Sequence, residues 1–233
     1  MIVSHTRRFV FVKTRKTAGT SIEIALSRYS GPDDILTPDT AEDEEMRLSW
    51  GGRPAQNRTV PVARWRAKDW LRWAARRPDP LFYNHMPATE IRRYLGRATW
   101  ESYFKFTIER NPWDLAVSAW SWYSTREPMS FEEFVASDVL GHYSNWRLYT
   151  IRERVAVDWV IRYDQLSAML PQMAERLGLP ETPVLPRAKG SFRLDSRPYQ
   201  EIYGDAERKR VENLFRREIE AFGWTYDVEP SVC

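Results

Sequence analysis

Residues 9–29, FVFVKTRKTAGTSIEIALSRY, decide the fold that this sequence predicts. Residues 9–12 are a short run of β-branched and aromatic side chains, which indicates a buried strand. Residues 13–19 have the composition of a turn, and from Thr20 onward apolar side chains recur at helical spacing. The expected order is therefore strand, loop and helix, and Gly31 is expected to end the helix.

This order recurs twice further along the chain. Strands are expected at residues 103–108 and 155–163, and helices follow them at 113–123 and 166–177. Further helices are expected at 62–77, after Pro87, after Ser130 and from Asp205, which is expected to cap the last one. Strands that alternate with helices predict an α/β fold with a parallel sheet covered on both faces, and ligands bind at the carboxyl ends of the strands of such sheets.

Length and composition fit one domain, residues 1–233, in which roughly 35–80 is expected to be a variable insertion on the acceptor side. The net charge of +3 does not require a nucleic-acid partner, since a positive cleft serves any anionic ligand. The single cysteine, Cys233, allows no disulfide within the chain. Because no signal peptide or spanning segment is visible, we expect a soluble, cytoplasmic protein without stable membrane insertion.

The first loop, KTRKTAGTS at residues 13–21, has the chemistry of an anion site. It leads into a helix whose first N–H groups and dipole favour negative charge. The hydroxyls of Thr17, Thr20 and Ser21 add donors, and Lys16 adds a mobile positive charge. The loop is not a Walker A motif, because its lysine precedes its only glycine; a plain polar turn is the alternative.

The second loop, ERNPWDLAVSAWSWY at residues 109–123, offers a second anion site. An arginine fork at Arg110 and the hydroxyl of Ser118 could hold a phosphate together. The alternative is a structural pair of Arg110 with Asp114. Two such loops at equivalent ends of neighbouring strands fit a ligand that carries two separated phosphates.

These motifs resemble those of sulfotransferases that use 3′-phosphoadenosine-5′-phosphosulfate (PAPS). KTAGTS at 16–21 resembles the loop that binds the 5′-phosphosulfate, and RNPWDLAVS at 110–118 resembles the 3′-phosphate motif. AKGSF at 188–192 is similar to a Lys-Gly loop that closes over the nucleotide. YNHMPATEIR at 83–92 is similar to a segment of uronyl and heparan sulfate 2-O-sulfotransferases that carries a histidine base, and 197–204 looks like the C-terminal part of carbohydrate sulfotransferases.

The resemblance implies a P-loop-like three-layer fold and transfer of a sulfuryl group from PAPS to a hydroxyl of a glycan, without a metal. Lys16 and His85 would be catalytic. The donor would be bound by Lys16, Thr17, Ala18, Gly19, Thr20, Ser21, Arg110, Ser118, Lys189 and Gly190. Many family members have proline where this chain has Arg15, and the Golgi members carry a membrane anchor. The missing anchor is more typical of bacterial or viral members.

Several alternatives stay open. Glu23 or Glu90 could be the base instead of His85. The acceptor could be a small alcohol or phenol, or the protein could be a P-loop-like kinase that needs magnesium. A non-catalytic nucleotide or nucleic-acid binding module would bind with steep salt dependence. The basic, tryptophan-bearing segment at 62–77 could line an acceptor cleft or be a solvated face over the core. The acceptor and the oligomeric state are not determined by the sequence.

Overall fold

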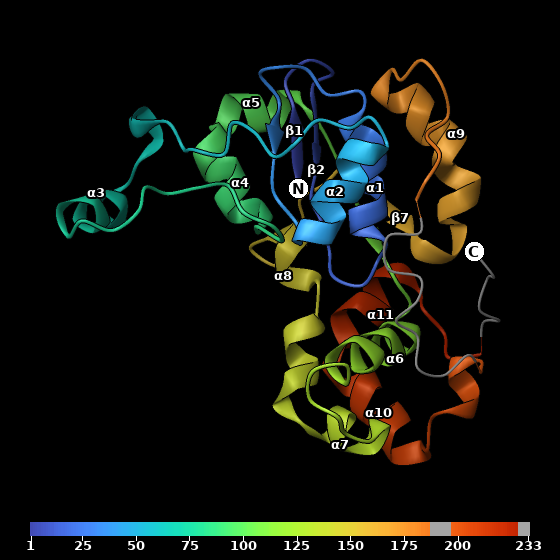
Figure 1. Cartoon of the computed structure of the whole chain (residues 1–233). Coiled ribbons are helices and arrows are strands. Elements are labelled where there is room, and N and C mark those ends of the chain that lie inside the picture. Colours follow the sequence, from blue (N-terminus) through green and yellow to red (C-terminus); the bar gives the residue numbers. More distant parts are fainter. Residues whose placement is uncertain (187–196, 228–233) are drawn as a thin grey trace.

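The computed structural model describes residues 1–186 and 197–227. Its centre is a five-stranded sheet in the order β3-β1-β2-β4-β7 (Figure 1). The strands are β1 Ile2–Ser4, β2 Phe9–Phe11, β3 Ile35–Leu36, β4 Phe104–Glu109 and β7 Trp159–Arg162. β2 pairs in parallel with β4, and β4 in parallel with β7. Only β1 runs against the others, because it is antiparallel to both β2 and β3.

The described helices are α1 Gly19–Ser27, α2 Ala41–Ser49, α3 Ala67–Ala74, α4 Ala88–Leu95, α5 Arg97–Ser102, α6 Pro112–Tyr123, α7 Phe131–Ala136, α8 Trp146–Tyr149, α9 Leu166–Leu177, α10 Asp205–Leu214 and α11 Arg216–Phe222. Short 3₁₀ turns are η1 Val62–Arg64, η2 Asp138–Tyr143, η3 Tyr163–Gln165 and η4 Tyr199–Glu201. A small hairpin joins β5 Thr150–Ile151 to β6 Arg154–Val155. The expected boundaries of the helix at 166–177 are confirmed, and Gly178 ends it in the left-handed conformation.

Helices cover both faces of the sheet because side chains alternate along each strand. Val10 faces a core that includes Ile91 of α4 and Tyr149 of α8. Phe9 and Phe11 face the opposite core, together with side chains of α1 and α9. The chain is therefore a mixed α/β protein with a mostly parallel sheet between helices. A third core joins α6, α7, α10 and α11 beside the sheet (Figure 1).

The predicted parallel sheet contains one antiparallel strand, β1. The sequence predicts no strand within residues 1–8, yet Ile2–Ser4 forms β1 and brings β3 to the sheet. Residues 35–49 of the expected insertion thus supply an edge strand and α2, which packs on α1. Only the stretch around α3 projects from the body of the molecule (Figure 1).

Three expected elements are shorter than the patterns indicated. The strand at 155–163 is divided, since Val155 belongs to the β5–β6 hairpin and the carboxylate of Asp158 accepts the N–H of Lys105 before β7 begins. The helix at 62–77 is interrupted at Trp65, whose backbone is extended. The last helix breaks at Phe215, and Gly204 rather than Asp205 is its N-cap.

Candidate functional site

Three neighbouring parallel strands bring polar groups to one edge of the sheet. β2 leads into the loop at 12–18, β4 into Arg110, and β7 into Tyr163. The carboxyl ends of adjacent parallel strands meet at the same edge, as the sequence predicted. The guanidinium carbon of Arg110 lies 4.3 Å from the centre of the Tyr163 ring, so these segments are in contact.

The loop before α1 has an unusual backbone. Lys16 and Ala18 both have a φ of 60°, a left-handed conformation that is uncommon for residues other than glycine. Ala18 is the N-cap of α1 and has no side chain that accepts a hydrogen bond. The first-turn N–H groups of α1 are thus not capped by that residue, which is the arrangement of a helix start that receives an anion.

The loop hydroxyls do not all face outward as expected. The Thr17 hydroxyl is fully buried and lies 2.8 Å from the hydroxyl of Thr14. The Thr20 hydroxyl donates to a carboxylate oxygen of Asp39 over 2.6 Å. Ser21 is buried in the first turn of α1. Of these three residues, Thr17 and Thr20 therefore use their hydroxyls to shape the loop, so they are not the main donors to a ligand.

The two expected anion loops touch each other. Arg110 donates from Nη1 to the carbonyl oxygen of Lys16 over 3.1 Å, and from Nε to Asp114 over 2.6 Å. The structural pair of Arg110 with Asp114 is therefore present, and it sets the plane of the guanidinium. Arg110 itself is almost buried.

Ser118 lies on the face of α6 that meets the first loop. Asp114, Ser118 and Trp122 are spaced by four residues, so their side chains follow one another along one side of the helix. The ammonium of Lys16 lies 4.9 Å from the centre of the Trp122 ring. Asp114 binds Arg110, which contacts the first loop, and Trp122 contacts Lys16 of the same loop. Ser118 lies between these two points of contact.

His85 also reaches the first loop. Its Nδ1 lies 3.1 Å from the carbonyl oxygen of Lys13. Because a carbonyl oxygen only accepts, Nδ1 carries the hydrogen, and Nε2 holds the lone pair of the neutral ring. Burial, followed by the charge of Lys13, lowers the pKa of His85 to about 3. His85 has a φ of 56°, so its backbone is also left-handed.

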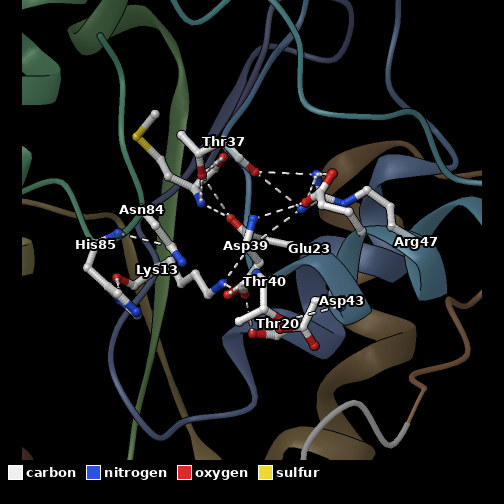
Figure 2. A network of polar contacts seen from close by, with 12 residues as sticks. Lys13, Thr20, Glu23, Thr37, Asp39, Thr40, Asp43, Arg47, Asn84 and His85 are labelled. Carbon is white, nitrogen blue, oxygen red and sulfur yellow. Dashed lines mark hydrogen bonds and ion pairs between the residues drawn. The ribbon is translucent and has the colours of Figure 1, made fainter.

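A buried network of charges underlies the loop (Figure 2). The ammonium of Lys13 contacts carboxylate oxygens of Glu23 at 2.6 Å and Asp39 at 2.5 Å. Arg47 of α2 approaches Glu23 to 3.8 Å from the other side. All four side chains are almost wholly buried, so each charge depends on the others for compensation. Glu23, one alternative for the base, is therefore bound in ion pairs beneath the loop.

The structure brings together Lys16, Thr17, Ala18, Gly19, Thr20, Ser21, His85, Arg110 and Ser118. Lys189 and Gly190 lie outside the described residues. Three residues of this edge, Tyr163, Asp39 and Asn145, were not predicted from the sequence. Tyr163 could have been found, since it directly follows a strand. Asn145 could not have been found, because it is 130 residues away from Arg15 in the sequence. Its side chain accepts the N–H of Arg15 and donates to the carbonyl oxygen of Arg15.

No group of three or more His, Cys, Asp or Glu side chains within residues 1–186 and 197–227 is arranged to hold a metal ion. In the same described part of the chain, no helix combines the length and apolar character needed to cross a bilayer.

The fold and the site define the class of this protein: an α/β protein with a polar site at the carboxyl edge of its parallel strands. A relative from Archaeoglobus fulgidus is 34% identical over 102 residues, which cover 41% of this chain and 85% of the relative. The chain belongs to the family of that archaeal protein, which is described as an uncharacterized protein. No family model matches the sequence. No solved structure matches it either.

Proposed function

We propose that this protein is a PAPS-dependent sulfotransferase of P-loop-like fold, whose acceptor is a hydroxyl of a carbohydrate. One observation carries the proposal: the first loop is contacted both by Arg110, at the carbonyl of Lys16, and by His85, at the carbonyl of Lys13. The three segments that resemble the family's donor and base segments are distant in sequence, yet they meet at one edge of the sheet.

The residues of this edge fit the charges of the donor. The 5′-phosphate would accept N–H groups of residues 17–21 at the start of α1. The 3′-phosphate would be held by Arg110, whose guanidinium plane is set by Asp114 and Tyr163, and by Ser118. Lys189 and Gly190 would cover the nucleotide, as the resemblance implies.

The donor supplies the sulfuryl group, and the residues of the site position the acceptor and manage charge and protons. His85 would take the proton of the acceptor hydroxyl on Nε2, because its Nδ1–H donates a hydrogen bond to the carbonyl oxygen of Lys13. Lys16 would stabilise the negative charge that develops on the phosphate oxygen as the sulfur–oxygen bond breaks. Bound anions would favour the imidazolium form of His85 and raise its pKa from its low value.

Calorimetric titration with 3′-phosphoadenosine-5′-phosphate, without magnesium, tests the donor site. Wild type should bind, and Arg110→Ala should bind at least about tenfold more weakly because a charged hydrogen-bonding partner is lost. Arg97→Ala is the control, since Arg97 is exposed on α5, which precedes β4 and so lies at the opposite edge of the sheet. Its affinity should equal that of wild type.

Failure of the folded wild type to bind this nucleotide, together with magnesium-dependent binding of ATP, would overturn the proposal in favour of a kinase. If the nucleotide binds, transfer of labelled sulfate to glycans and to simple phenols separates the two classes of acceptor. Under the base assignment, His85→Ala should bind the nucleotide normally and lose most of its turnover. Retention of most turnover would exclude His85 as the base.

A further inference from the structure

A segment at 61–77, which we name the basic arm, projects from the body of the molecule, and only its Trp65 packs against the core beside the sheet. It contains η1 and α3, and α3 forms its projecting tip (Figure 1). Its base is closed by backbone hydrogen bonds from Val60 to Pro80 over 3.0 Å and from Phe82 to Arg58 over 2.8 Å. The arm is therefore an ordered projection with a paired base.

One side of α3 is tied to the body. Asp69 is buried, accepts the hydroxyl of Tyr94 of α4 over 3.3 Å, and accepts the N–H of Arg66 over 2.9 Å. The indole N–H of Trp65 donates to the carbonyl of Val60 over 3.0 Å. These bonds set the rotation of α3, so the direction of its remaining faces is determined.

The outward side of α3 is apolar. Trp70, Leu71 and Trp73 are 47%, 71% and 58% exposed, and Val62 of η1 is 55% exposed. Ala67, Trp70, Leu71 and Ala74 follow the i, i+3, i+4, i+7 spacing of one helix face. Trp70 packs edge-on between Trp65 and Trp73, with ring centres 5.1 and 6.1 Å apart. The exposed rings thus form one connected patch.

Positive charge is concentrated in the same arm. The basic arm holds Arg64, Arg66, Lys68, Arg72, Arg76 and Arg77. Asp69 is its single acidic side chain, and it is buried. The arm has an excess of five positive charges, although the whole chain has a net charge of only +3. Lys68 and Arg72 are four residues apart and lie beside the apolar stripe rather than within it.

We propose that the basic arm docks on an anionic lipid bilayer surface, with α3 lying in the headgroup region. Tryptophan and leucine on one face and basic residues on the other are the features of helices that lie in the membrane interface. An acidic glycan would account for the charges, but not for the exposure of Leu71 and Val62. Such docking needs no spanning helix, and it does not depend on the proposed sulfotransfer.

Cosedimentation with vesicles of phosphatidylglycerol and phosphatidylcholine tests this docking. The protein should partition to them more than about tenfold better than to pure phosphatidylcholine, and high salt should weaken the difference. Trp70→Ser/Leu71→Ser/Trp73→Ser and Arg72→Glu/Arg76→Glu should each lose most of this binding. Because all five residues lie on the projecting arm, thermal unfolding and nucleotide binding should stay near wild type, which separates this test from that of the donor site.

Two controls match these variants in chemistry. Leu48→Ser removes another exposed leucine, on α2, and Lys209→Glu/Arg210→Glu reverses two exposed charges on α10. Both should bind vesicles like wild type. Equal loss in the controls, or no binding of wild type to anionic vesicles, would overturn the proposal. So would arm-dependent binding of a sulfated glycan, or arm-dependent dimerisation, without vesicle binding.

Discussion

His85 shows how the position of one residue controls its chemistry. It lies ahead of α4 in a left-handed conformation, and its ring is held against the carbonyl of Lys13. Burial and the nearby ammonium of Lys13 keep the ring neutral, with a pKa of about 3. The same low pKa that leaves Nε2 unprotonated near neutral pH also links His85 to the stability of the fold.

The stability of the protein should depend on His85 in mildly acidic solution. Below pH 6.5 the unfolded chain takes up a proton on this histidine, whereas the folded chain does so only near pH 3. The contribution of His85 is therefore present above pH 6.5 and is lost as the pH falls, by up to about 1.4 kcal/mol per pH unit. His85→Asn should remove this loss, and asparagine tolerates the left-handed backbone.

Denaturant unfolding gives the free energies of unfolding of His85→Asn and wild type at pH 7 and at pH 5. The effect is the change, between the two pH values, in the difference between these free energies. His142→Asn, at an exposed position of η2, is the matched control. A difference between His85→Asn and wild type that is the same at both pH values would contradict a neutral, buried His85.

At the scale of elements, the junction of the first loop with α1 depends on Gly19. A Cβ atom at this position would lie 2.7 Å from Cγ of Lys13 and 3.3 Å from the carbonyl oxygen of Thr14. Lys13 cannot move aside, because Glu23 and Asp39 hold its ammonium in the buried network. The glycine therefore allows a close approach between the strand end and the helix start.

Gly19→Ala should destabilise the protein by about 1–3 kcal/mol, as overpacking of a close contact does. It should also weaken binding of 3′-phosphoadenosine-5′-phosphate, since the first-turn N–H groups of α1 would shift. Gly141→Ala is the matched control, because a Cβ there would meet no atom within 4 Å. Unfolding and calorimetry on both variants check the prediction, which would be wrong if the two variants behaved alike.

At the scale of the whole molecule, Glu109 links the end of β4 to the first loop through Asn145. This buried carboxyl ends β4 and accepts the amide of Asn145 over 3.3 Å. Asn145 in turn holds the backbone of Arg15 in the first loop. Burial, and to a lesser extent the charge of Glu218 on α11, raises the pKa of Glu109 to about 7.

Glu109 should therefore reduce stability as the pH rises. Between pH 4.5 and 7 the unfolded chain releases this proton while the folded chain keeps it, so unfolding becomes easier across that window. The free energy of unfolding of Glu109→Gln minus that of wild type should be larger at pH 8 than at pH 4.5, by up to about 3 kcal/mol. Glu212→Gln, at an exposed position of α10, should show no such change. Unfolding free energies at both pH values decide between these outcomes.

Local patterns determined much of this protein. A short apolar run predicted β2, apolar alternation predicted β4, helical spacing with Gly178 predicted α9, and the two loops were placed correctly at the ends of adjacent strands. These features depend on residues a few positions apart, whose side chains share a face of one element. The exposed apolar side of α3 was not predicted, because the same tryptophans were equally compatible with a face that covers the core.

Only the tertiary structure decided which distant groups compensate one another. Asn145 binds Arg15 across 130 residues, and Asp39 reaches Lys13 from the segment after β3. No periodicity within the chain encodes such pairs, because a buried charge accepts any partner that the packing brings within reach. The strand β1 was missed for a related reason: three residues are too few for a pattern, and its pairing with β2 and β3 is what makes it a strand.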